Sequence, residues 1–205
     1  MRARGLAKSY QVVARRDLPV DTVQLARYLI GMIVVRRAQD GVLSGRIVET
    51  EAYPVGDSTS HAYRGETPGN HALFLAPGHA HVYLAYGSSY MLNVSSEDAG
   101  VGAGVLIRAL EPLDGVATMQ RLRGVQSLRD LARGPGRLAA ALDIDRSLDG
   151  VDLCRRGDLW IARDLHVAPE VGISPRIGLS RETDRLLRFY VRGDRFVSGP
   201  KALNR

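Results

Sequence analysis

The sequence predicts one domain that combines α-helices with a β-sheet. The chain has 205 residues, 45% of them hydrophobic, which suffices for a single sizeable core. A helix pattern precedes a run of strand patterns, and two further helix patterns follow them. No Gly-rich linker or internal repeat divides the chain. Residues 1–17 are basic and weakly patterned, so we expect a flexible arm there and one folded domain over residues 18–205.

The first half of the chain is predicted to hold one helix and most of the strands. Asp21 can cap a helix that runs to Ile30, because apolar residues recur there at helical spacing and Gly31 can end it. The loop over residues 54–72 is too long for a simple connection, and such loops are usually functional or disordered. Strands are expected over residues 32–37, 43–53, 79–86, 90–95 and 105–110, the first two joined by a turn at residues 39–41.

The second half is predicted to begin with helices and to end with short strands. Helices are expected over residues 113–123 and 128–144, the second interrupted at residues 133–136 by Gly and Pro. The helix restarted at Arg137 could face a phosphate with its free amide groups, or it could complete a simple helix-turn-helix. Short strands are expected around residues 160–161, 166–167, 173, 177–179 and 187–191.

The positive charge of the chain is almost entirely arginine. The formal net charge is +6 and the sequence pI about 9.8, with Lys8 and Lys201 as the only lysines. This balance favours a polyanionic partner, and the planar guanidinium suits phosphates and base edges. A GC-rich genome would produce the same arginine bias, so composition indicates nucleic acid without establishing it.

Several protein classes are disfavoured by what the sequence lacks. Cys154 is the only cysteine, which excludes an intrachain disulfide and fits a reducing compartment. No apolar run approaches the ~18 residues of a membrane span, and no signal-peptide core begins the chain. No ATP-type phosphate-binding loop occurs. We therefore expect no membrane, no cofactor, and a cytoplasmic location with the bacterial nucleoid, or a nuclear one, rather than secretion.

Two acidic residues share one face of the strand predicted over residues 43–53. Alternation places Ile47, Glu49, Glu51 and Tyr53 on one side, with Glu51 near the strand's end. Because unpaired buried acids are unfavourable, such a face is either solvated or part of a site. The spacing leaves both interpretations open.

Four histidines close in sequence raise the possibility of a metal site: His61, His71, His79 and His81. His79 and His81 share a strand face, as two ligands would. No His-x-x-x-His pair or cysteine completes a known pattern. A metal-dependent hydrolase is therefore a minor alternative, and we expect no metal.

Tyrosines gather around the candidate acid: Tyr53, Tyr83, Tyr86 and Tyr90. Tyrosines on strands usually pack in the core or across strands. In a basic protein they can also stack on bases, worth roughly 1–3 kcal/mol per base. The residues alone favour packing.

A series of short motifs runs from the first predicted helix to the C-terminus. They are Glu49-Thr-Glu-Ala-Tyr53 followed by His61, Thr67-Pro-Gly-Asn70, Tyr83-Leu-Ala-Tyr-Gly87, Asn93-Val-Ser-Ser96, Leu106-Ile-Arg-Ala-Leu-Glu-Pro112, Gly134-Pro-Gly-Arg-Leu138 and Arg188-Phe-Tyr-Val-Arg192. In this order they resemble the alkyladenine (3-methyladenine) DNA glycosylase family, the methylpurine DNA glycosylases. The resemblance implies an α+β domain with a curved, mainly antiparallel sheet and flanking helices.

The resemblance also implies chemical roles. Glu51 would be the general base that activates water against the sugar, and Arg108 would help to position that water. Tyr53, His61 and Tyr83 would stack on a flipped purine, whose edge the main-chain amide of His61 would read.

Other positions would contact DNA or exclude normal bases. Asn93 would crowd the exocyclic amine of guanine, and Tyr86 would enter the stack where the base has left. His81 departs from the tyrosine frequent in animal members, and Gly69 replaces a basic residue. Three residues would contact the DNA backbone: Arg64, Asn70 and Arg137.

We therefore predict a DNA repair glycosylase that flips alkylated or deaminated purines out of duplex DNA. It would hydrolyse the N-glycosidic bond of 3-methyladenine, 7-methylguanine or hypoxanthine with water activated by Glu51, and it would have no lyase activity. The expected partner is double-stranded DNA and the expected state a monomer. Glu49→Gln is expected to reduce base release far less than Glu51→Gln. The alternatives are a non-catalytic nucleic-acid-binding module and the histidine-based metal-dependent hydrolase.

Overall fold

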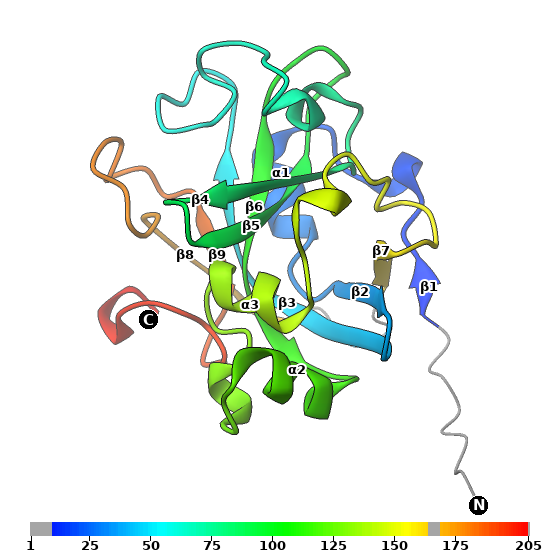
Figure 1. The fold of residues 1–205 in the computed structure, drawn as a ribbon. Coiled ribbons are helices and arrows are strands. Elements are labelled where there is room, and N and C mark those ends of the chain that lie inside the picture. Colours follow the sequence, from blue (N-terminus) through cyan, green and yellow to red (C-terminus); the bar gives the residue numbers. More distant parts are fainter. Residues whose placement is uncertain (1–9, 164–168, 205) are drawn as a thin grey trace, which may run out of the picture.

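Nine antiparallel strands form one sheet that curls into a half-barrel, and three α-helices pack on it (Figure 1). The computed structural model describes residues 10–163 and 169–204, and all counts refer to these residues. The predicted α+β fold class with a curved antiparallel sheet is confirmed. The helices are α1 (Thr22–Tyr28), α2 (Val116–Arg123) and α3 (Pro135–Ala141). The strands are β1 (Gln11–Val12), β2 (Ile33–Ala38), β3 (Gly41–Tyr53), β4 (Ala80–Ala85), β5 (Ser89–Ser95), β6 (Gly104–Pro112), β7 (Leu159–Arg163), β8 (Val171–Ser174) and β9 (Arg188–Val191).

Strand β3, with 13 residues, is the spine of the sheet. Along one edge it pairs first with β2, from Gly41 to Arg46, and then with β9 beside Glu49 and Glu51. Along the other edge it pairs with β6 from Gly45 onward. The half of β3 that carries the two glutamates is therefore enclosed on both edges, which buries it.

A β-bulge in β3 changes which side chains share a face. The register with β6 shifts just after Ile47. Ile47 packs in the same apolar cluster as Ala52, whereas Val48 packs in a different one. An extra residue in one strand breaks the simple alternation that follows it. The predicted common face is therefore wrong for Ile47 and right for Glu49 and Glu51, which bind the same arginine.

Helix α1 begins as its sequence predicts and anchors the middle of β3. The carboxylate of Asp21 accepts the N–H of Gln24 at 2.8 Å, and Gly31 follows the helix with φ +87°. The buried hydroxyl of Thr50 donates to the carbonyl of Ala26 at 2.9 Å. The helix thus fixes β3 at the residue between its two glutamates.

The second predicted helix of the later half is split. Residues 128–130 form only a 3₁₀ turn, and α3 begins at Pro135. Proline is tolerated at this first helical position because an N–H there would have no hydrogen-bond partner within the helix. A Cβ on Gly136 would lie 2.8 Å from the Cβ of Ser89, so only glycine allows this approach. Helix α3 consequently lies next to β5, below it in Figure 1, and α2 packs on α3.

Several predicted boundaries are corrected. Residues 10–17 belong to the domain, because β1 pairs with β7 and Val13 is fully buried. Residues 1–9 of the predicted arm lie outside the described residues, as does the strand predicted at residues 166–167. Residues 177–179, predicted as a strand, form an irregular loop.

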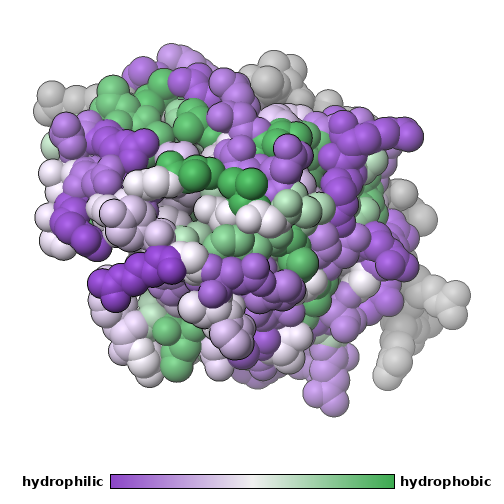
Figure 2. Space-filling model, turned by 90° about the horizontal axis from the view of Figure 1, so that it is seen from above, coloured by the Kyte–Doolittle hydropathy of each residue, from purple (hydrophilic) through white to green (hydrophobic). Residues whose placement is uncertain are grey.

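The face of the molecule in Figure 2 is mostly hydrophilic, with apolar residues in separate small areas. Isolated apolar residues of this kind are ordinary on protein surfaces. Among the described residues, none of the helices has the length and apolar character needed to cross a bilayer.

Candidate active site

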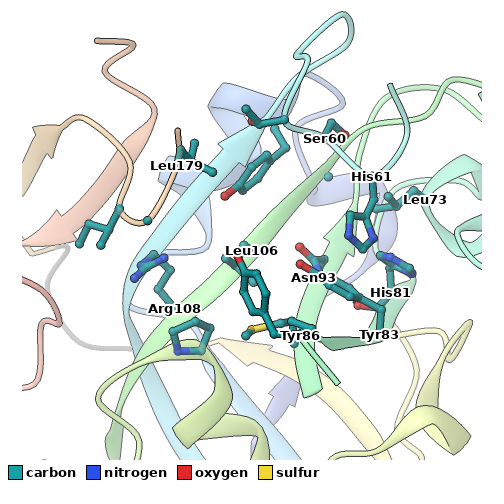
Figure 3. A pocket seen from close by; sticks show the side chains of 18 of the residues that line it. Ser60, His61, Leu73, His81, Tyr83, Tyr86, Asn93, Leu106, Arg108 and Leu179 are labelled. Atoms are coloured by element: carbon teal, nitrogen blue, oxygen red, sulfur yellow. The ribbon is translucent and has the colours of Figure 1, made fainter. Parts of the chain in front are cut away.

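A cavity of about 420 Å³ lies over strands β3 to β6, within the size range of small-ligand sites. In Figure 3, His61, His81 and Tyr83 lie on one side, Arg108 and Leu179 on the other, and Asn93 between them. The lining residues are Tyr53, Thr59, Ser60, His61, Leu73, His81, Tyr83, Leu84, Ala85, Tyr86, Met91, Asn93, Gly104, Leu106, Arg108, Pro135, Ile177, Gly178 and Leu179.

Three aromatic rings form one wall of this cavity. The centroids of His61 and Tyr83 are 3.8 Å apart, with the rings tilted by 46°. His81 stacks on Tyr83 at 5.3 Å and 19°. Mutual packing of this kind fixes ring orientations before any ligand arrives. The wall is suited to stacking against a flat ligand.

Both histidines of the wall are neutral. Nδ1 of the fully buried His81 lies 3.1 Å from Oδ1 of Asp149, and because a carboxylate only accepts, Nδ1 carries the proton. Burial lowers the pKa of His81 to about 4, outweighing the opposite effect of Asp149. Burial also lowers the pKa of His61. The wall therefore presents uncharged rings at neutral pH.

Glu51 lies beneath the cavity floor, fully buried, rather than at the open strand end that its sequence position suggested. Its Oε1 accepts the N–H of Ile177 at 2.7 Å. Its Oε2 accepts the hydroxyl of Tyr53 at 3.0 Å and lies 3.2 Å from Nη1 of Arg108. All three donor residues line the cavity. Three donors thus contact the carboxylate of Glu51, each from a residue that borders the cavity.

Glu49, the neighbouring acid, is the centre of a buried ion-pair network. Its Oε1 lies 3.0 Å from Nε of Arg108 and 2.7 Å from Nε of Arg188. Its Oε2 accepts the N–H of Ser198 at 2.7 Å. With Glu51, two negative and two positive side chains balance inside the sheet, all of them buried. Such pairing is what makes the burial of charges tolerable.

Arg188 uses all five N–H groups of its guanidinium. Beyond Nε, which binds Glu49, its two Nη atoms have four acceptors, at 2.7 to 3.1 Å: Oγ of Ser174, O of Leu203, O of Ser198 and Oδ1 of Asn204. The arginine thereby ties the C-terminal segment to the acid-bearing strand.

The two glutamates differ in their tendency to ionise. Burial disfavours both charges, but at Glu49 Arg108 and Arg188 outweigh it, so the pKa of Glu49 is lowered. At Glu51 burial outweighs the contacts with Arg108 and Ile177, so the pKa of Glu51 is raised. Glu49 therefore releases its proton more readily than an ordinary glutamate, whereas Glu51 holds its proton more firmly than one.

Tyr86 projects from the tip of the β4–β5 hairpin at the cavity's edge. Its side chain is 94% exposed and its φ is +52°. Gly87 also has positive φ, and the N–H of Ser88 donates to the carbonyl of Ala85 at 3.1 Å, as in a type I′ turn. A bulky residue in the left-handed region costs roughly 1–2 kcal/mol. Residues with strain of this kind cluster at functional sites.

The remaining predicted site residues fall in different places. Asn93 lines the cavity and donates to the carbonyl of His81 at 3.2 Å. Asn70 is buried, and its side chain holds the long loop together through hydrogen bonds with Thr67, His61 and Gly65.

The two predicted backbone-binding arginines are exposed and stay candidates. Arg64 lines a smaller cavity of about 220 Å³ beside the main one, together with Arg181. Arg137 lies on the first turns of α3, 3.8 Å from Asp130.

The four histidines considered as metal ligands engage different partners. His71 lies 2.5 Å from Glu66, His79 contacts the carbonyl of Ala76 at 2.8 Å, and His61 and His81 belong to the aromatic wall. No group of three or more potential metal ligands comes together among the described residues. The histidine pattern therefore loses the geometric support that a metal-dependent hydrolase requires.

Sequence reasoning missed the residues that hold the two glutamates. Arg188 appeared only inside a resembling motif, and Ser198 had no signal. The N–H of Ile177 was hidden in a predicted strand, although Pro175 two residues earlier is a loop signal. The arginines near the end of the chain are visible in the sequence, but their burial against the two glutamates is not.

Comparison with known proteins gives a consistent family. A family model for methylpurine-DNA glycosylase matches residues 16–195. A protein of Mesorhizobium japonicum named "Putative 3-methyladenine DNA glycosylase" is 66% identical over 191 residues, covering 93% of this chain and 92% of its own. Proteins with the same name from Paraburkholderia phytofirmans and Rubrobacter xylanophilus are 56% and 44% identical, covering 92% and 86% of this chain and 89% and 92% of their own.

Replacing Glu49 by Gln should destabilise the fold strongly. Removing one partner of a buried ion pair leaves the other charge uncompensated, at a cost of about 3–5 kcal/mol. Because its pKa is lowered, Glu49 stabilises the fold above the pH at which the unfolded glutamate titrates, and this contribution is lost as pH falls through the folded-state pKa. Urea unfolding at pH 7 measures the cost.

Glu51→Gln is the matched control. The raised pKa of Glu51 means that its ionised form already destabilises the fold, so this substitution should cost much less than Glu49→Gln. An equal or larger loss for Glu51→Gln would contradict the assignment.

Proposed function

The chain belongs to the methylpurine-DNA glycosylase family, and from this premise we propose that Glu51 activates the water that releases a damaged purine base from duplex DNA. Membership of this family identifies the chain as a DNA glycosylase. The observation that supports the further proposal is the position of Glu51, buried and held by three residues that line a base-sized cavity: Ile177, Tyr53 and Arg108.

The proposed reaction is a hydrolysis with balanced atoms. The oxygen of water bonds to the anomeric carbon of the sugar, a proton of that water passes to Glu51, and the N-glycosidic electron pair leaves with the base. The raised pKa of Glu51 makes its carboxylate a stronger proton acceptor than that of an ordinary glutamate. Arg108, which contacts both acids, keeps Glu51 in place and balances its charge.

The substrates proposed are alkylated or deaminated purines, namely 3-methyladenine, 7-methylguanine and hypoxanthine. A base in a duplex must be rotated out before chemistry, and damaged or mispaired bases cost least to extrude. The wall of His61 and Tyr83 would stack on one face of the purine and Tyr53 on the other. Asn93 would limit the space for the exocyclic amine of normal guanine.

We further propose that the enzyme acts as a monomer and stops after base release. Glycosylases that also cleave the strand generally use an amine that forms a Schiff base with the sugar. Lys201 lies in an exposed turn at the C-terminal segment and does not line the cavity. Lys8, the other lysine, lies outside the described residues.

Parent protein incubated with duplexes carrying one lesion each should release free base, and EDTA should not prevent it. Glu51→Gln should reduce release at least ~100-fold, because an amide cannot take the water's proton, while DNA binding in a mobility-shift assay remains. Strand breaks should appear only after hot alkali.

Release by Glu51→Gln within threefold of the parent would contradict the role of Glu51. No release by the parent would favour a non-catalytic nucleic-acid-binding module, and loss of release in EDTA would favour a metal-dependent hydrolase. A covalent adduct trapped by borohydride would contradict the proposal that the enzyme only removes the base.

Replacing Tyr86 by Ala should weaken base flipping, because nothing then fills the stack that the purine leaves. A fluorescent base analogue opposite the lesion reports the flipped state, and the loss should be greatest for lesions in stable pairs. Tyr86→Leu should retain more flipping than Tyr86→Ala. Tyr63→Ala removes another exposed tyrosine, one outside the main cavity, as a control. Equal flipping by parent and Tyr86→Ala would leave Tyr86 without this role.

A further inference from the structure

The guanidinium of Arg176 lies directly behind the ring of Tyr53. Its Cζ is 4.6 Å from the ring centroid, and the residue is only 4% exposed. Tyr53 lines the cavity and Arg176 does not. The arginine therefore covers a part of the ring that the cavity does not reach.

The polar contacts of Arg176 are made by Nη1, so the rest of its guanidinium group is left to interact with that ring. Nη1 lies 2.7 Å from Asp57 and 3.0 Å from the carbonyl of Ala52. Asp57 shares its carboxylate with Arg185, at 3.2 Å, so it compensates two cations. Nε and Nη2 of Arg176 are buried and have no hydrogen-bond partner within the described residues. The π electrons of Tyr53 are the group left to balance these N–H donors.

Arg176 and its neighbour hold the ring and the acid together. The N–H of Ile177 binds Oε1 of Glu51, and the hydroxyl of Tyr53 binds Oε2 of the same carboxylate. The two consecutive residues thus fix both the stacking surface and the proposed general base. A change at Arg176 reaches the pocket without removing a residue that lines it.

We propose that Arg176 is a specificity-determining residue that biases the pocket toward neutral purine lesions, such as hypoxanthine, over cationic N-alkylated ones. This inference rests on the proposed function. An aromatic ring attracts cations through its electron-rich faces. Because Arg176 already interacts with one face of the Tyr53 ring, a second cation stacked on the opposite face is attracted less strongly to the ring. The positive charge of Arg176 also repels this second cation. A neutral purine pays no such penalty.

The test compares two lesions in one sequence context, 7-methylguanine as the cationic base and hypoxanthine as the neutral one. Single-turnover release is measured for the full chain, and the 7-methylguanine to hypoxanthine rate ratio of each variant is divided by that of the parent. This normalisation cancels the different leaving abilities of the two bases. The informative variant is Arg176→Met with Asp57→Asn, which removes both buried charges together.

The normalised ratio should rise at least about threefold in the double variant, the low end of what one cation–π contact is worth. Arg176→Lys keeps the positive charge and should leave the ratio near one. Arg185→Gln removes the outer contact to Asp57 without touching Tyr53, so it should also leave the ratio near one. If the double variant does not fold, Arg176→Gln, which can still bond to Asp57, provides the same comparison.

A merely structural role would slow both lesions alike, so an unchanged ratio in a folded charge-removing variant would overturn the inference. A ratio that rises equally in Arg185→Gln would also overturn it, because loop disturbance would then explain the effect. If the parent releases neither base, the proposed function fails and this inference fails with it. Release of both bases by the parent with an unchanged ratio in the variants overturns the inference alone.

Discussion

The sharing of one arginine by two buried acids is the interaction on which this structure depends. Arg108 reaches Glu49 with Nε and Glu51 with Nη1, from the strand paired with theirs. Without it, two carboxylates on one face of a fully enclosed strand would repel each other in a medium that solvates neither. The enclosing strand β9 and the C-terminal segment are held in turn by Arg188 on Glu49. The same buried charged residues therefore stabilise the fold and form part of the candidate site.

The division of labour between the acids follows from their surroundings. Glu49 receives two arginines and two groups of Ser198, whereas Glu51 receives one arginine and two neutral donors. These contacts lower the pKa of Glu49, whereas the pKa of Glu51 stays raised by burial. Pairs of carboxylates with separated pKa values are a recurrent way to assign distinct roles to identical side chains.

The sequence contained the strands, the first helix and the residues around the cavity, because these rest on local periodicity and on motif order. It could not show the bulge after Ile47, since one extra residue leaves no mark on composition. It misplaced Glu51 as open because the covering strand β9 lies far along the chain. Likewise, the three hydrogen bonds that the side chain of Asn70 makes within its loop could not be read from the sequence. Long-range burial was the missing information in each case.

The most direct test of this account is a site-resolved titration of the two acids. Side-chain carboxyl carbons of labelled glutamate can be followed by NMR as pH is lowered, with Glu49→Gln and Glu51→Gln identifying the two signals. The account predicts that Glu51 titrates above, and Glu49 below, the value of about 4.3 for an ordinary glutamate. The reverse order, or a common titration near that ordinary value, would contradict it.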